Sequence, residues 1–256
     1  MSGMSEFFRL EATDQVATVI IDRPAKRNAM SYEMWSAIPG LLASVPDSAR
    51  VLVIRGGEHF CAGADISEFQ TLRADAAGAR RYGEAIHAGQ RAITGLGLPT
   101  IALINGFCIG GGCELALSCD LRIAASDARF GITPAKLGIV YSLTSTKQLV
   151  DVVGPAWAKQ ILYSADLIDA ATALRIGLVN ELHDQSEVDT RVKELAETIA
   201  SRAGVSVRGA KTIVNRLAAG RFEEDDSVRA VYEEAVHSAE YTEGVRAFLD
   251  KRPPKF

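Results

Sequence analysis

The sequence holds few of the residues that build metal sites or disulfide frameworks. Four cysteines and four histidines occur among its 256 residues. No two cysteines have C-x-x-C spacing, and the scattered histidines form no H-E-x-x-H motif, so neither residue type predicts a metal site. Three of the four cysteines lie in one apolar, glycine-rich region; the four are Cys61, Cys108, Cys113 and Cys119. We therefore expect buried free thiols in a reducing compartment, with no metal and no disulfide.

The chain also lacks an excess of positive charge and a long apolar run. Its net charge is −4 and its pI about 5.7, which argues against a nucleic-acid surface. No apolar stretch is long enough to span a bilayer. The N-terminal segment M-S-G-M-S-E-F-F-R-L has no basic part followed by an apolar part, so it predicts no signal peptide. We expect a cytoplasmic protein that binds neither nucleic acid nor membrane.

The sequence does contain enough apolar material for a large core. Hydrophobic residues make up 48% and charged residues 23% of the chain, as in one large domain or a domain with an appendage. Five apolar runs predict strands between helical segments, namely Val16–Ile21, Val51–Ile54, Thr100–Ile104, Leu121–Ala124 and Leu178–Leu182. From Glu187 onward all segments are amphipathic in the helical period. We predict an α/β core over residues 1–186 and a helical region over 187–256 that packs on the core or joins subunits.

The most informative stretch is I-N-G-F-C-I-G-G-G-C-E-L-A-L-S-C-D, from Ile104 to Asp120. A strand ends in the Asn105-Gly106 turn, and three glycines then lead into a short apolar helix. Converging backbone N–H groups in such a turn can hold an oxygen anion. Glu114 lies among apolar neighbours, where burial would raise its pKa and suit it to proton transfer. The alternative is a tightly packed strand-to-helix turn in which Glu114 is only a cap.

A second turn of this kind follows the strand at Val51–Ile54. The segment F-C-A-G-A-D-I-S-E-F, Phe60–Phe69, places Gly63 and Ala64 at the edge of the sheet where ligands commonly bind in α/β folds. Asp65 comes next and is expected to cap the helix that follows.

Three other side chains have both a structural and a functional interpretation. Lys26 and Arg27 lie in a polar turn, either as solvated loop charges or as contacts to the phosphate of an anionic ligand. Tyr141 ends a segment rich in turns. It is either a core residue whose hydroxyl is satisfied, or a hydrogen-bond donor to a substrate.

Four motifs together resemble the crotonase superfamily, the enoyl-CoA hydratase/isomerase group. They are R-P-A-K-R-N-A-M (Arg23–Met30), F-C-A-G-A-D-I (Phe60–Ile66), N-G-F-C-I-G-G-G-C-E-L-A-L-S-C-D (Asn105–Asp120) and A-F-L-D-K-R-P-P-K-F (Ala247–Phe256). The resemblance covers nearly the whole chain. It implies an α/β fold with a ββα spiral core and a C-terminal helical trimerisation region. It also implies a homotrimer or dimer of trimers, and an acyl-CoA thioester as substrate, with coenzyme A present only as part of that substrate.

The resemblance also implies roles for particular residues. The thioester carbonyl would lie between the N–H groups of Ala64 and Gly111, and Glu114 would be the first of two hydratase glutamates. Positions that match coenzyme A contacts of the family are Ala25, Lys26, Arg27, Ala64, Asp65, Ile66, Gly110, Gly111, Phe248 and Lys251. The last two match tail positions that reach coenzyme A from a neighbouring helix or subunit.

The sequence departs from the hydratase pattern at one position. Hydratases carry the second glutamate in a stretch like F-G-x-P-E-x-x-L-G, whereas this chain reads F-G-I-T-P-A-K-L-G and has Pro134 there. The stretch up to Tyr141 is partly similar to the methylmalonyl-CoA decarboxylase branch, in which a tyrosine at that position orients the leaving carboxylate. That branch has a histidine after the first oxyanion turn, whereas this chain has Asp65.

Three hypotheses remain open on the sequence, in order of preference. The first is a hydratase or isomerase in which Glu114 moves the proton. The second is a decarboxylase of a malonyl-type CoA ester that uses Tyr141. The third is a non-catalytic protein that binds acyl-CoA, which the presence of Glu114 and both glycine turns argues against.

Overall fold

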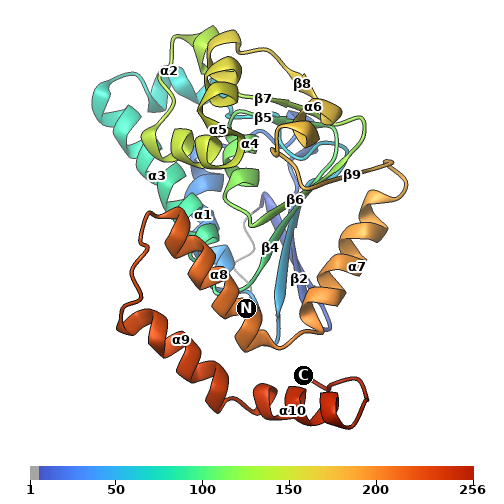
Figure 1. Ribbon diagram of the computed structural model, residues 1–256. Helices are drawn as coiled ribbons and strands as arrows, with labels where there is room; N and C mark the ends of the chain where they lie inside the picture. The colour runs from blue at the N-terminus through green and yellow to red at the C-terminus, as the bar shows by residue number, and fades with distance from the viewer. Residues whose placement is uncertain (1–5) are drawn as a thin grey trace.

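Two β-sheets form the centre of the computed structural model, which describes residues 6–256 (Figure 1). The larger sheet has the order β1-β2-β3-β4-β6-β9, antiparallel between β1 and β2 and parallel elsewhere. Its strands are β1 (Phe8–Thr13), β2 (Val16–Ile21), β3 (Val51–Arg55), β4 (Thr100–Ile104), β6 (Leu121–Ala125) and β9 (Glu181–His183). Residues 1–5, on which the expectation about a signal peptide partly rests, lie outside the described residues.

The smaller sheet has three strands, two of which directly follow strands of the larger sheet along the chain. It has the order β5-β7-β8, made of β5 (Phe107–Ile109), β7 (Arg129–Gly131) and β8 (Ile168–Asp169). The chain passes from β4 to β5 through Asn105-Gly106 and from β6 to β7 through a similar short turn. A bridge between Cys61 and Cys108 brings the segment after β3 to the same sheet. The passes through β4–β5 and β6–β7 therefore each place one strand in each sheet before a helix or helical turn follows, and the pass after β3 adds only the bridge at Cys61.

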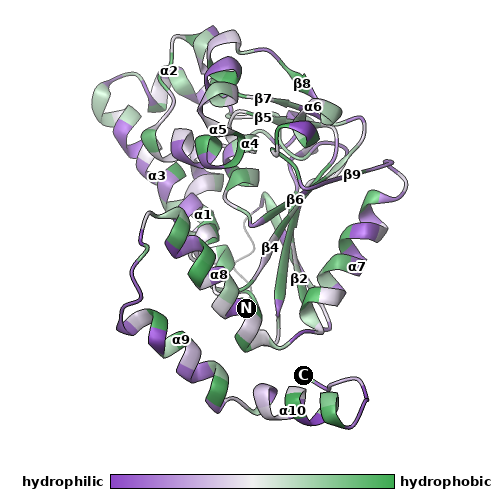
Figure 2. Cartoon of the chain, in the orientation of Figure 1, coloured by the Kyte–Doolittle hydropathy of each residue, from purple (hydrophilic) through white to green (hydrophobic). Residues whose placement is uncertain are grey.

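The central strands β3 and β4 of the larger sheet are buried on both faces, which explains why they are continuous, largely apolar runs. Leu52 and Ile54 of β3 belong to one buried cluster together with residues of α1 (Tyr32–Leu42) and α3 (Ala76–Thr94). Val51 and Val53 point to the opposite face and pack with α7 (Val188–Ala200). Figure 2 shows these strands as largely hydrophobic between helices with hydrophilic outer faces.

The remaining helices cover the edges of the sheets and the C-terminal region. They are α2 (Phe69–Leu72), α4 (Gly111–Leu117), α5 (Leu143–Ser164), α6 (Ala170–Arg175), α8 (Gly204–Ala218), α9 (Asp226–His237) and α10 (Ala239–Leu249). Short 3₁₀ turns lie at η1 (Pro24–Lys26), η2 (Ile66–Glu68) and η3 (Pro134–Leu137). Helix α5 contains a break at Gly154, whose φ of 75° and ψ of 164° are not helical. Among the described residues, no helix combines the length and apolar character that a membrane span requires.

The predicted C-terminal helical region divides into a part that packs on the sheet and a part that projects. Helix α7 covers one face of the larger sheet. Helix α8 is attached to the core because Lys211 Nζ lies 2.9 Å from an Asp120 carboxylate oxygen and donates to the Leu98 carbonyl. Helices α9 and α10 extend away from the sheets (Figure 1). The boundary predicted at residue 187 therefore does not separate every later helix from the core, and the joining of subunits stays a prediction.

Candidate active site

The two glycine turns predicted from the sequence lie side by side. One turn follows β3 and the other follows β5. Cys61 N–H donates to the Phe107 carbonyl, and Ile109 N–H donates to the Cys61 carbonyl, each over 2.8–2.9 Å. Gly63 has a φ of +115° and Gly110 a φ of +49°, a region that favours glycine. The ladder between the strands thus holds the two turns in a fixed register.

Close approach explains the glycine run at the start of α4. A Cβ on Gly112 would lie 2.5 Å from the Cys61 carbonyl oxygen, and a Cβ on Gly111 would lie 3.6 Å from the Ala64 nitrogen. The Gly111 distance is an ordinary contact, whereas a side chain at Gly112 would push α4 and the turn after β3 apart.

The predicted oxyanion donors are brought together and are unused. Ala64 and Gly111 both line one cavity. Among the described residues, no oxygen accepts a hydrogen bond from the N–H of either one. Two neighbouring N–H groups without acceptors are available to a ligand oxygen, such as the carbonyl of a thioester that gains negative charge during a reaction.

Glu114 lines the same cavity on the first turns of α4. It is only 8% exposed. Burial raises the pKa of Glu114 to about 7, and this rise is opposed by the hydrogen bond from Ser145, by the nearby Tyr141 hydroxyl and by the positive charge of Arg73. A carboxyl group with a pKa near neutrality can both accept and return a proton at physiological pH.

A hydrogen-bond network from α5 and α3 fixes the orientation of the Glu114 carboxylate. Ser145 Oγ donates to Glu114 Oε1 over 2.8 Å. Ser145 Oγ itself accepts from Ser142 Oγ at 2.9 Å and from Gln90 Nε2 at 3.2 Å. Because both acceptor positions of the hydroxyl are occupied, its single proton is directed at Glu114. The other carboxylate oxygen, Oε2, is left for proton exchange.

Tyr141 is also brought to Glu114. Its hydroxyl is buried and makes no hydrogen bond of ordinary geometry with the described residues. Burial, and then the neighbouring Glu114 charge, raise the pKa of Tyr141 well above its usual value. The hydroxyl therefore remains protonated at neutral pH and can donate to a bound molecule. The interpretation of Tyr141 as a satisfied core residue does not describe this environment.

The cavity has a volume of about 500 Å³ and largely apolar walls. Phe69, Ile86 and Ile139 contribute to these walls. Pro134 lies in the wall at the position where hydratases carry the second glutamate. Among the described residues that line the cavity, Glu114 is the sole carboxylate.

Of the other residues predicted to contact a ligand, some line this cavity and some do not. Ile66 and Gly110 line it. Asp65 does not, because its carboxylate is 2.8 Å from Arg23 and accepts from Ser67, contacts that hold the pKa of Asp65 below its usual value. As predicted, Asp65 caps a following turn, η2.

The basic turn after β2 borders a second, smaller cavity of about 360 Å³. Ala25 and Arg27 line it, and Lys26 is exposed in η1 beside them. Phe248 and Lys251 lie at the far end of α10, remote from α4 in Figure 1. The chain alone does not bring these two residues to the cavity of Glu114, so their predicted contact would require a neighbouring subunit.

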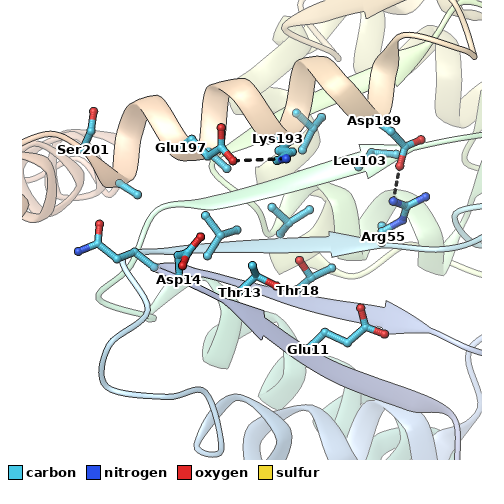
Figure 3. A pocket seen from close by; sticks show the side chains of 16 residues that line it. Glu11, Thr13, Asp14, Thr18, Arg55, Leu103, Asp189, Lys193, Glu197 and Ser201 are labelled. Atoms are coloured by element: carbon cyan, nitrogen blue, oxygen red, sulfur yellow. Dashed lines mark hydrogen bonds and ion pairs between the residues drawn. The ribbon is translucent and has the colours of Figure 1, made fainter.

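A third cavity, of about 420 Å³, lies between α7 and the outer face of β1, β2, β3 and β4 (Figure 3). Four of its charged side chains pair with one another, Arg55 with Asp189 and Lys193 with Glu197. It contains no counterpart to the free N–H groups and buried carboxyl group of the other cavity. We therefore assign the chemistry to the cavity that contains Glu114.

The sequence model of the enoyl-CoA hydratase/isomerase family matches residues 11–256. The chain belongs to this family. It is 38% identical to a crotonyl-CoA hydratase of Syntrophomonas wolfei, over 96% of both chains. It is 37% identical to a short-chain-enoyl-CoA hydratase of Clostridium acetobutylicum, over 95% of this chain and 94% of that one.

Solved structures confirm the predicted fold of the enoyl-CoA hydratase/isomerase family. An enoyl-CoA hydratase/isomerase family protein from Hyphomonas neptunium superposes with a TM-score of 0.95 at 37% identity, covering 100% of this chain and 99% of that one. An enoyl-CoA hydratase/carnithine racemase from Magnetospirillum magneticum gives a TM-score of 0.94 at 32% identity, covering 99% and 96%. The α/β crotonase fold followed by C-terminal helices is thus confirmed.

These relatives leave some expectations open. They give no support to the partial similarity with the methylmalonyl-CoA decarboxylase branch. Other family members are named as mitochondrial or peroxisomal proteins, so a cytoplasmic location stays a prediction for this chain.

Proposed function

We propose that this family member binds a short enoyl-CoA thioester and hydrates or isomerises it, with Glu114 as the residue that moves the proton. One observation carries the proposal: a buried carboxyl group with a pKa of about 7 shares a cavity with two unbonded N–H groups. The names of the hydratases from Syntrophomonas wolfei and Clostridium acetobutylicum support a short acyl group.

In the proposed mechanism, the thioester carbonyl oxygen accepts from the N–H groups of Ala64 and Gly111. For hydration, ionised Glu114 takes a proton from water as the oxygen of that water bonds to C3 of the enoyl group. The electrons of the C2–C3 double bond move toward the thioester, whose enolate oxygen is stabilised by the two N–H donors. Protonated Glu114 then returns a proton to C2. Isomerisation uses the same enolate, with one proton removed and one returned by Glu114.

This mechanism uses one carboxylate where hydratases of the usual pattern have two. A single residue suffices because the proton that Glu114 accepts is the proton it later donates. We propose further that Ala25, Lys26 and Arg27 contact the coenzyme A portion at its phosphates. Phe248 and Lys251 of a neighbouring subunit would complete this contact in a homotrimer or a dimer of trimers.

The experiment that tests the proposal follows loss of the conjugated thioester absorbance of crotonyl-CoA. Glu114→Gln should reduce kcat by about 10²–10⁴-fold, the range expected for general acid–base catalysis. Its affinity for saturated butyryl-CoA should stay near that of the wild type, since the amide replaces the carboxylate with little change in shape. Glu33→Gln, an exposed site on α1, is the matched control and should keep full activity.

Two outcomes would contradict the proposal. Substantial turnover by Glu114→Gln would remove Glu114 from its role in proton transfer. Release of CO2 from methylmalonyl-CoA by a protein inactive on enoyl-CoA substrates would favour the decarboxylase hypothesis instead.

A further inference from the structure

The cavity of Glu114 contains one cation, Arg73, whose side chain forms no ion pair and no hydrogen bond with the described residues. Four side chains in its lining can carry charge, and they are Arg73, His87, Glu114 and Lys136. Lys136 faces Asp166 at 4.0 Å on the surface. Burial and Arg91 lower the pKa of His87, so this side chain is neutral at pH 7. Arg73 adds a positive charge that makes no ion pair in the part of the chain that the structure describes, and the acidic group it influences through the cavity is Glu114.

Aromatic rings, rather than oxygen atoms, hold the Arg73 side chain. Its guanidinium carbon lies 4.4 Å from the ring centre of Phe69 and 5.5 Å from that of Tyr82. These rings meet edge to face with centres 5.8 Å apart. Ring faces attract the charge of a guanidinium but leave the N–H groups at its edge without acceptors. The Arg73 side chain accordingly makes no hydrogen bond or ion pair with any described residue, although its backbone N–H donates to the Phe69 carbonyl.

The two aromatic rings that contact Arg73 belong to Phe69 and Tyr82, and Tyr82 is itself fixed by hydrogen bonding. The guanidinium is therefore positioned before a ligand binds. Tyr82 is buried, and its hydroxyl donates to Glu68 Oε2 over 3.1 Å. The same oxygen accepts from Tyr32 N–H over 2.8 Å. Glu68 is thereby occupied by two donors other than Arg73. An arginine fixed in this manner presents a rigid pair of donors that matches the geometry of a carboxylate.

Arg73 lines the same cavity as Glu114, which would place it beside the acyl portion of a substrate. Arg73 lies close enough to Glu114 for its charge to lower the pKa of that carboxyl group. Glu114 would act at C2 and C3 of the acyl chain, so a cation in the same cavity lies near the carbons beyond them. The rest of the wall there is apolar, with Phe69 and Ile86. An unpaired cation in such surroundings is unfavourable unless a ligand supplies the counter-charge.

We propose that the preferred substrates are acyl thioesters whose acyl chain ends in a second carboxylate, and that Arg73 binds this carboxylate. The inference rests on the proposed function for the presence of a thioester, and it adds the class of acyl group. A plain alkyl chain would leave the guanidinium without a partner, whereas a dicarboxylic acyl chain would form a charge-assisted pair with it. Arg73 is thus assigned as the residue that determines specificity.

Binding of saturated thioesters tests this inference separately from turnover. Glutaryl-CoA and pentanoyl-CoA have the same carbon skeleton and differ in the terminal carboxylate; adipoyl-CoA and hexanoyl-CoA form a second pair one carbon longer. Calorimetric titration of the wild-type protein should show each dicarboxylic ester bound about tenfold more tightly than its partner. Arg73→Gln should remove the difference, Arg73→Lys should retain part of it, and Arg80→Gln, an exposed site on α3 outside the cavity, should leave it intact.

Several results would overturn the inference. Equal or tighter binding of the monocarboxylic esters in both pairs would do so. An equal loss of affinity for all four esters in Arg73→Gln would assign Arg73 to the coenzyme A portion that they share. If crotonyl-CoA is hydrated but the preference for dicarboxylic esters is missing, the proposed function stands and this inference fails. If the preference is present but no enoyl-CoA reacts, the binding inference stands and the proposed reaction fails.

Discussion

At the scale of single residues, burial raises the pKa of Glu114 and the Ser145 hydroxyl opposes that rise. It donates to Glu114 Oε1 at 2.8 Å, and a donor favours the ionised form of a carboxylate. Ser118 lies one helical turn after Glu114, and its hydroxyl donates to the backbone carbonyl of Glu114 rather than to the carboxylate. The two serines therefore form a matched pair, in which only one hydroxyl acts on the carboxylate.

Replacing Ser145 should shift the pH dependence of catalysis. Without this donor the pKa of Glu114 rises above its value of about 7. The ionised form required for the first proton transfer then appears only at higher pH. We expect the rising limb of kcat against pH to move upward by about one pH unit in Ser145→Ala. Ser145→Thr, which keeps the hydroxyl, and Ser118→Ala should retain the original midpoint, and a midpoint unchanged in Ser145→Ala would contradict the role of Ser145.

The residues of the site were predictable to different degrees. Glu114 and the two glycine turns were predicted from local sequence, because such turns and a carboxylate in an apolar run are visible in a short window, whereas the choice of Ala64 and Gly111 as N–H donors came from the family resemblance. Ser145 and Arg73 were missed. Ser145 lies in the first turn of α5, and its hydroxyl reaches Glu114 on α4. In the sequence, a serine at this position suggests only the start of a helix. Arg73 lies in a polar segment, and the position of its side chain depends on the contact between the Phe69 and Tyr82 rings, which the sequence does not reveal.

At the scale of elements, contact between α4 and the turn after β3 depends on a glycine. A Cβ on Gly112 would lie 2.5 Å from the Cys61 carbonyl oxygen and 2.9 Å from the Cys61 Cβ. Neither atom belongs to a flexible side-chain end, so α4 or the turn would have to shift. Such a shift would separate the N–H groups of Ala64 and Gly111.

We expect Gly112→Ala to lower the free energy of unfolding by about 1–3 kcal/mol, as overpacking of a core does. It should also lower kcat for crotonyl-CoA. Gly40→Ala is the control, since Gly40 is exposed within α1 and no atom lies within 4 Å of the added Cβ. That variant should gain about 0.5–1 kcal/mol from higher helix propensity. Denaturant titration measures both changes, and equal stability of the two variants would contradict the packing argument.

Long elements were predictable from the sequence, whereas short ones were not. Strands β2, β3, β4 and β6 were predicted because each is a mostly apolar run, and β3 and β4 are buried on both faces. Strand β1 was missed, since the sequence F-R-L-E-A-T has one buried residue and several exposed ones at the edge of the sheet. The smaller sheet was missed because its strands have two or three residues. Pairings between distant segments create such strands, and local periodicity does not reveal them.

At the scale of the whole molecule, the outer C-terminal helices expose apolar side chains. Tyr241, Val245, Phe248 and Leu249 of α10 are between 45% and 83% exposed. Exposed apolar patches of this kind commonly lie in contacts between subunits. The predicted trimer or dimer of trimers would cover them.

Polar substitutions on α10 should therefore weaken assembly. In sedimentation experiments, the double variant Phe248→Ser with Leu249→Ser should shift the protein toward smaller species, while Tyr163→Ser, at an exposed position on α5, should not. If Phe248 also reaches coenzyme A bound to a neighbour, the KM for crotonyl-CoA should rise in the same variant. A wild-type protein that sediments as a monomer at all concentrations would contradict the predicted oligomer.

Helices α9 and α10 make few buried contacts with the rest of the chain, and this affects the exchange of their backbone amide protons. Within these two helices only Val228 and Ala247 are buried, and the Arg50–Glu240 ion pair ties the start of α10 to the strand region. Local opening of such a segment needs little free energy. Deuterium should therefore enter the amides of α9 and α10 rapidly in dilute, dissociated protein and slowly at concentrations that favour assembly, while the amides of β3 and β4 stay protected in both.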